Sequence, residues 1–134
     1  MRYNDLKSKA HCKFLLVYHV VFVTKFRYRC LSHDILQDLL SVLPKMAEEM
    51  LVKITDINGD KDHMHFLLEL SPQDTLGNVI GALKAKSSSY LKRKYKFPYF
   101  GKHLTTLWSS GYFVVSTGSA PLDIVKNYIQ NQRA

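Results

Sequence analysis

Residues 62–70 read DHMHFLLEL, and this stretch decides the fold. Successive side chains of a β-strand point to opposite faces of the sheet. Every second residue from Met64 to Leu70 is apolar, so these side chains are expected to face a hydrophobic core. His63 and His65 then project together from the other face, with Cα atoms roughly 7 Å apart. The stretch predicts a strand in an antiparallel sheet that has one covered face and one open face.

The sequence on either side of 62–70 predicts an alternation of strands and helices. The expected elements are a strand at 13–25, a helix at 32–50, a strand at 51–59, the strand at 62–70, a helix at 74–95, a strand at 112–117 and a C-terminal helix at about 120–132. The first six follow the order βαββαβ, which predicts the ferredoxin-like α+β class: one antiparallel sheet with its helices on one face. The length of 134 residues suits a single domain spanning 1–134.

Local signals refine these elements. Ser32 suits the N-cap of the first helix, and apolar residues then recur at helical spacing. Pro44 is expected to bend or divide that helix. Asn58 and Gly59 form the residue pair most typical of a two-residue hairpin turn, so they are expected to connect the strands 51–59 and 62–70.

The net charge favours a polyanionic partner. Nineteen Lys and Arg residues against eleven Asp and Glu leave a charge of +8, which favours nucleic acid, with an anionic membrane surface as second choice. Nine of the nineteen lie in 25–29 and 84–96, beside aromatic residues, as suits phosphate contacts next to stacked, unpaired bases. A solvated surface that only aids solubility is the alternative. The side chains expected to contact phosphates are Lys25, Arg27, Arg29, Lys84, Lys86, Lys92, Arg93 and Lys94.

The histidine pair is a candidate metal site. Two parallel imidazoles can chelate one divalent ion, although two half-exposed histidines on an ordinary strand give the same short pattern. In the C-terminal helix, Tyr128 and Gln132 are one turn apart on a shared face. Gln132 offers a carbonyl oxygen that suits Mg²⁺ or Mn²⁺, and Tyr128 offers a phenol that attacks only a strongly polarised target. The sequence leaves open whether these two are ordinary surface residues, and whether His19 neighbours the pair.

Five stretches together resemble a known family. They are YHVVFVTKFRYR (18–29), DHMHFLLEL (62–70), IGALKAKSSSYL (80–91), LWSSGYFVVSTG (107–118) and YIQNQ (128–132). In this order and spacing, the chain resembles over nearly its whole length the small single-tyrosine transposases of the HUH endonuclease superfamily. These IS200/IS605-type enzymes mobilise bacterial and archaeal insertion sequences as single-stranded DNA. Lys61 departs from the pattern, because the family often has proline two residues before the first histidine, and this puts the turn geometry in doubt.

The resemblance implies an enzyme that cuts and rejoins single-stranded DNA with a divalent metal, Mg²⁺ or Mn²⁺. His63, His65 and Gln132 would be the metal ligands. Tyr128 would be the nucleophile, releasing a 3′-hydroxyl and retaining the 5′-phosphate as a phosphotyrosine. A 3′-hydroxyl would later attack this link, so no nucleotide cofactor is needed.

The resemblance also implies partners. The DNA would carry a hairpin near the element end, and two copies would join their sheets edge to edge as a homodimer with composite active sites. The long, apolar first strand is the expected joining edge, since such an edge is otherwise a liability. The apolar runs are too short to span a bilayer and the N-terminus lacks a secretory layout, so we expect no membrane partner and a location in a bacterial or archaeal cytoplasm.

Two other functions remain open. A non-catalytic module on a ferredoxin-like sheet would stack bases of single-stranded nucleic acid and depend on salt rather than on Mg²⁺. A domesticated relative would keep the chemistry but cut host hairpins without mobilising an element. A small metal-dependent hydrolase is least favoured, because no carboxylate pair or general base accompanies the histidines.

Overall fold

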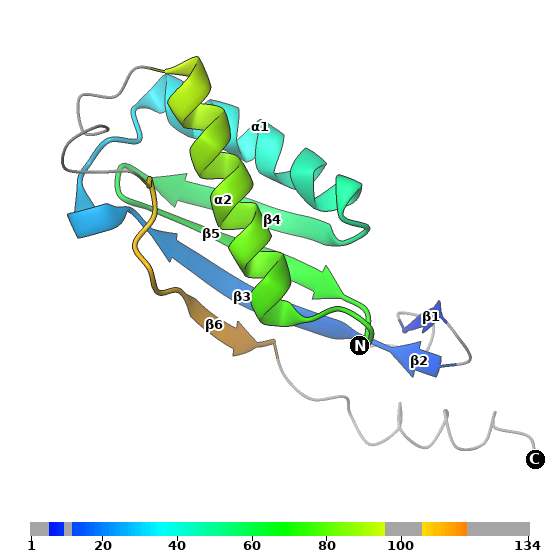
Figure 1. Cartoon of the computed structure of the whole chain (residues 1–134). Helices are drawn as coiled ribbons and strands as arrows, with labels where there is room; N and C mark the ends of the chain where they lie inside the picture. The colour runs from blue at the N-terminus through cyan, green and yellow to red at the C-terminus, as the bar shows by residue number, and fades with distance from the viewer. Residues whose placement is uncertain (1–5, 10–11, 96–105, 118–134) are drawn as a thin grey trace, which may run out of the picture.

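The computed structural model describes residues 6–9, 12–95 and 106–117 (Figure 1). Its elements are β1 (Lys7–Lys9), β2 (Cys12–Phe14), β3 (Leu16–Val23), the 3₁₀ turn η2 (Lys25–Arg27), α1 (His33–Glu49), β4 (Lys53–Asp60), β5 (His63–Leu70), α2 (Leu76–Lys94) and β6 (Phe113–Ser116). From β3 to β6 the order is βαββαβ, as predicted. The short hairpin of β1 and β2 was not predicted, because the apolar run at 13–25 conceals the break between β2 and β3.

The four longer strands form one sheet in the order β4-β5-β3-β6, in which all neighbours are antiparallel. This confirms the ferredoxin-like α+β fold. The expectation that the first strand is a sheet edge is wrong, because β3 pairs with β5 on one side and β6 on the other. Within the described residues, the edges of this sheet are β4 and β6.

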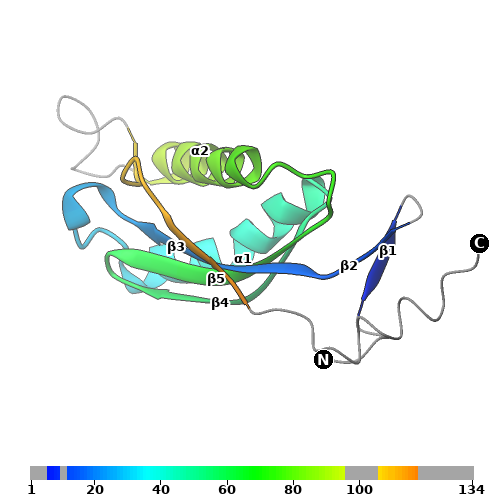
Figure 2. The same ribbon diagram turned by 90° about the horizontal axis from the view of Figure 1, so that it is seen from below.

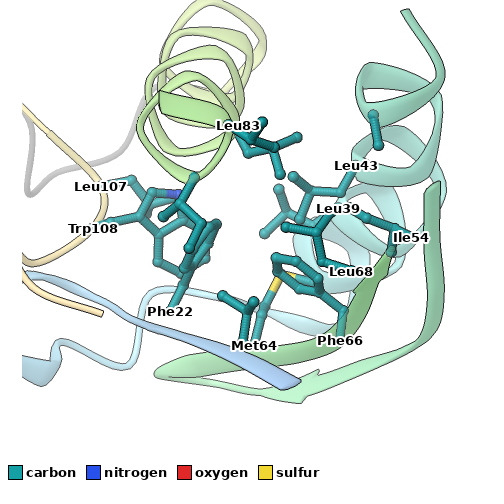
Figure 3. Packing of buried hydrophobic residues seen from close by; sticks show 14 of the residues in the cluster. Phe22, Leu39, Leu43, Ile54, Met64, Phe66, Leu68, Leu83, Leu107 and Trp108 are labelled. Atoms are coloured by element: carbon teal, nitrogen blue, oxygen red, sulfur yellow. The ribbon is translucent and has the colours of Figure 1, made fainter. Parts of the chain in front are cut away.

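Both helices cover the same face of the sheet, which leaves the other face without a helix in the described part of the chain (Figure 2). The core lies between these layers (Figure 3). Along β5, the side chains from Met64 to Leu70 alternate strictly between buried and half-buried, as its sequence predicted. Phe22 contacts Phe66 and Trp108, with ring centroids 5.2 and 5.4 Å apart.

Pro44 does not divide the first helix, since α1 is one helix of 17 residues. A proline removes one backbone hydrogen bond and crowds the preceding turn. Buried side chains lie on both sides of it, with Leu39 and Leu43 before it and Ala47 after it. Packing of this apolar face on the sheet therefore stabilises the helix across Pro44. Ser32 is the N-cap residue, as predicted, although its side chain makes no capping hydrogen bond.

The predicted turn at Asn58 and Gly59 is wrong, because both residues lie inside β4. The strand continues to Asp60, which pairs with His63. A β-bulge between Thr55 and Asn58 shifts the register, and the chain turns after Asp60 instead. Gly59 serves close packing: a Cβ atom there would lie 2.6 Å from the backbone oxygen of His63.

Candidate active site

His63 and His65 lie on β5, where they alternate with the core residues Met64 and Phe66, so they project from the sheet face opposite the core. Both are half-buried, and their rings lie side by side with centroids 6.2 Å apart and planes inclined by 21°. They pair in register with Val23 and Val21 of β3. The alternation of β5 therefore places both imidazoles on one face, in the arrangement that the sequence predicted.

Asp62 holds the ring of His63. The distance between His63 Nδ1 and Asp62 Oδ1 is 2.9 Å, and Arg27 Nη2 donates to Asp62 Oδ2 at 3.1 Å. The hydrogen bond from His63, and then that from Arg27, hold the pKa of the Asp62 carboxyl below its usual value. An ionised carboxylate only accepts hydrogen bonds, so this contact requires a proton on Nδ1 of His63. In a neutral imidazole with that proton, Nε2 has the free lone pair that a metal ligand needs.

The sequence reasoning assigned no role to Asp62. The usable signal was its place next to a candidate metal ligand, because metal-binding histidines almost always donate their other ring N–H to a carboxylate, a carbonyl or water. Arg27 was expected only to contact phosphates. Its partner could not be foreseen, since the two residues are 35 positions apart in the chain.

His19 of β3 neighbours the pair, which answers the question that the sequence left open. Its ring centroid is 5.7 Å from that of His65, in an edge-on arrangement with an angle of 71°. His19 pairs with Leu67 in register, so it lies diagonally from His65 across the two strands. Three imidazoles thus follow one another along this face of the sheet.

A metal at this site needs ligands beyond the histidine pair. Across 6–9, 12–95 and 106–117 there is no group of three or more His, Cys, Asp or Glu side chains arranged to hold an ion. Tyr128 and Gln132 lie outside the described residues. The described part of the site therefore offers two oriented imidazoles, a donor set that suits a transition-metal ion such as Mn²⁺ when oxygen ligands complete it.

The expected phosphate-binding residues lie in two places. Lys25, Arg27 and Arg29 follow β3 at the end of the sheet where His63 lies. The other five lie on α2, which covers the sheet face opposite the histidine pair (Figure 1). The two clusters nevertheless approach one another, because Lys25 of the first and Lys84 of the second line the same pocket.

Two of the α2 lysines have structural contacts. Lys84 donates to the backbone oxygens of Ser109 and Gly111 at 2.6 and 3.1 Å, and burial lowers the pKa of its ammonium. Lys94 forms an ion pair with Asp38 of α1 at 2.8 Å, and this contact raises the pKa of Lys94. Both contacts fix local structure. Lys86, Lys92 and Arg93 are exposed on α2.

In the described part of the chain, no helix combines the length and the apolar character needed to cross a membrane. This finding bears only on the segments with described structure.

Comparisons with known proteins agree with this architecture. A family model described as "Transposase IS200 like" matches residues 12–132. The transposase for insertion sequence element IS200 of Salmonella typhimurium is 33% identical over 132 residues, which cover 96% of this chain and 84% of the relative. The ISDra2 transposase TnpA of Deinococcus radiodurans is 24% identical over 130 residues, which cover 96% of this chain and 91% of the relative.

Solved structures share the fold. A crystal structure of a Deinococcus radiodurans R1 protein assigned as a transposase superposes with a TM-score of 0.73 at 25% identity, covering 96% of this chain and 98% of the other. A REP-associated tyrosine transposase bound to a REP hairpin superposes with a TM-score of 0.56 at 14% identity, covering 92% of this chain and 66% of that one. The family match spans most of the sequence, and with it this chain belongs to the family of IS200-like transposases.

Proposed function

We propose that this transposase cuts and rejoins single-stranded DNA at the ends of an insertion sequence through a 5′-phosphotyrosine intermediate. The observation that carries the proposal is the oriented pair His63 and His65, with His63 fixed by Asp62 on an open sheet face. The family membership supplies the reaction class. In this proposal the whole chain, 1–134, acts as one domain.

Tyr128 is the proposed nucleophile. Its phenolic oxygen forms a bond to the scissile phosphorus and loses its proton, while the bond from phosphorus to the 3′-oxygen breaks and that oxygen gains a proton. Attack by a 3′-hydroxyl on the phosphotyrosine reverses these changes and joins two strands. Each step exchanges one phosphate ester for another, so no nucleotide cofactor is consumed.

Nε2 of His63, the imidazole of His65 and the side-chain oxygen of Gln132 would hold a divalent cation, Mg²⁺ or Mn²⁺. When bound, such an ion stabilises the negative charge that develops on the scissile phosphate. Asp62 keeps His63 in the tautomer that can bind an ion, and Arg27 keeps Asp62 in place. These contacts support a site that is oriented before the metal arrives.

The proposed DNA partner carries a hairpin near the cut. This part of the proposal is supported by a structural neighbour, a tyrosine transposase that is bound to a REP hairpin. The proposed phosphate contacts are the basic residues of the two clusters other than Lys84 and Lys94, namely Lys25, Arg27, Arg29, Lys86, Lys92 and Arg93. We also propose a homodimer with composite active sites. Because β3 is central, the joining edge in this proposal is β6, where Phe113 and Val115 are exposed.

A gel assay for a denaturant-resistant protein–DNA adduct tests the function. The substrates are single strands from both flanks of the gene, with and without Mg²⁺ or Mn²⁺. We expect an adduct that requires metal, that disappears in Tyr128→Phe and His63→Ala, and that persists in Tyr112→Phe, which removes the hydroxyl of an exposed tyrosine on the described surface.

Salt-sensitive binding without an adduct on any strand would instead favour the non-catalytic binding module. An adduct that forms only on hairpins elsewhere in the host genome would favour the domesticated relative. These outcomes separate the proposal from both alternatives.

A further inference from the structure

The turn that follows β3 exposes two aromatic rings among basic residues. Phe26 is 69% exposed and Tyr28 is 40% exposed. Their rings meet edge to face with centroids 5.9 Å apart, and the ammonium of Lys25 lies 5.8 Å from the centre of the Phe26 ring. We call residues 25–29 the aromatic turn; besides Lys25, its basic residues are Arg27 and Arg29. Large apolar rings are usually buried, so the exposed ring of Phe26, which contacts Tyr28, points to a ligand.

The backbone of the aromatic turn is strained and firmly held. Phe26 and Arg27 both have positive φ angles, of 56° and 55°, which non-glycine residues rarely adopt. Hydrogen bonds fix this shape: Thr24 Oγ1 donates to the oxygen of Tyr28 at 2.7 Å, and Lys25 N donates to the oxygen of Leu107 at 2.9 Å. A strained conformation that its surroundings enforce is typical of a binding site whose geometry is prepared in advance.

The aromatic turn is joined to the histidine pair. Thr24 N donates to the oxygen of Asp62 at 2.9 Å, and Arg27 forms its ion pair with the same residue. Asp62 in turn bonds His63. The exposed rings therefore belong to the same end of the sheet as the proposed metal ligand, one residue from the guanidinium that supports it.

We infer that Phe26 and Tyr28 form a stacking site for an unpaired base of the DNA strand, next to the phosphate that is cut. The inference rests on the proposed function for the place of the cut. Unpaired bases stack on aromatic side chains while neighbouring cations contact the backbone phosphates, and the aromatic turn supplies both groups. It would hold the strand in register with His63.

Charge argues against a second copy of this chain as the occupant. A symmetric contact through the aromatic turn would bring Lys25 and Arg29 against the same residues of the partner, and like charges in contact oppose association. A polyanionic strand meets no such repulsion. The base-stacking reading therefore fits the composition of the turn.

The test uses the full chain without added metal, so that binding is measured without cutting. Single strands from the flanks of the gene carry 2-aminopurine at one position at a time, because stacking on an aromatic ring quenches its fluorescence. The variants are Phe26→Leu, which keeps an apolar side chain but removes the ring, and Phe26→Tyr, which keeps the ring. Leu51→Ala, which shortens an 85% exposed apolar side chain at the other end of the sheet, is the matched control.

We expect quenching at one or two adjacent positions in the native protein, in Phe26→Tyr and in Leu51→Ala. Phe26→Leu should lose the quenching and bind the strand about 5- to 150-fold more weakly, the range expected for one stacked base. Because the Phe26 ring is exposed, circular dichroism and melting should show an unchanged fold.

Unchanged quenching and affinity in Phe26→Leu would overturn the inference, and a normal adduct in that variant would leave the proposed function standing. Quenching without any adduct would have the opposite meaning: the stacking site would stand and the strand-transfer chemistry would fail. A change in oligomeric state in Phe26→Leu, with DNA binding intact, would assign the rings to self-association and also overturn the inference.

Discussion

Replacing Asp62 by asparagine tests whether the histidine pair is a metal site. The carboxylate accepts the Nδ1 proton of His63 at 2.9 Å and leaves Nε2 able to bind an ion. An asparagine of similar size is a weaker, neutral acceptor, and its amide group can instead donate to Nδ1. The ring would then carry its proton on Nε2, the form that cannot bind a metal. We expect Asp62→Asn to weaken metal binding while the fold is retained.

The expected loss is about 10- to 100-fold in metal affinity, the usual effect of removing such a supporting contact. This corresponds to about 1.4–2.7 kcal/mol of binding free energy. The contact with His63 dominates, because the His63 side chain is 36% exposed, whereas that of Arg27 is 72% exposed. A solvated ion pair of the latter kind contributes little by itself.

Titration calorimetry with Mn²⁺ on the full chain measures the affinity directly, and the Mn²⁺ concentration needed for half-maximal adduct formation gives a second reading. Asp56→Asn is the matched control: it removes an exposed carboxylate on β4, at a positive φ of 47° that asparagine tolerates. A native Mn²⁺ affinity in folded Asp62→Asn would refute the idea that Asp62 sets the state of His63.

Three further predictions concern the scaffold. Ser87→Ala removes the acceptor of the buried Trp108 indole N–H, at 2.9 Å, and should lower the free energy of unfolding by about 1–3 kcal/mol in urea titrations. Gly59→Ala places a Cβ atom 2.6 Å from the oxygen of His63, so it should cost about 1–3 kcal/mol on the same measure and also reduce adduct formation. Burial raises the pKa of Asp38, but hydrogen bonds from a lysine and two tyrosines outweigh it and hold the pKa below 3.8. The stabilisation from this carboxylate is thus present above pH 3.8 and lost as the pH falls below it. Between pH 5 and pH 2, about the range in which such groups titrate, the unfolding free energy of Asp38→Asn should therefore change less than that of the native protein.

The alternation in β5 predicted both faces of the sheet correctly, because a period of two follows directly from strand geometry. The order βαββαβ then limited the topology to a sheet with its helices on one side. Tertiary packing decided what the sequence misjudged. Buried neighbours keep α1 continuous across Pro44, and a bulge in β4 moves the turn beyond Asn58. Turn and helix-breaking signals are local, and these outcomes depend on contacts made elsewhere.

In the candidate site, too, local spacing predicted some features and tertiary contacts determined the others. The shared face of His63 and His65 follows from spacing alone, whereas the proximity of His19 depends on the register between β3 and β5. The contact between Arg27 and Asp62 joins two turns that only the folded sheet brings together. Charge clustering identified the aromatic turn only as a basic stretch. It could not show that Lys84 binds the backbone oxygen of Ser109 or that Lys94 pairs with the carboxylate of Asp38.

The alternation of histidine and core positions along β5 limits how such a gene can diverge. Odd positions carry the histidines and even positions carry the core. Deleting or inserting one codon within this strand would turn every later side chain to the other face, so that polar groups enter the core and apolar groups reach the open face of the sheet. Substitutions within either set leave this order intact. The length of this segment is therefore under tighter constraint than its composition, and alignments of diverged copies should show gaps at the ends of β5 and none inside it.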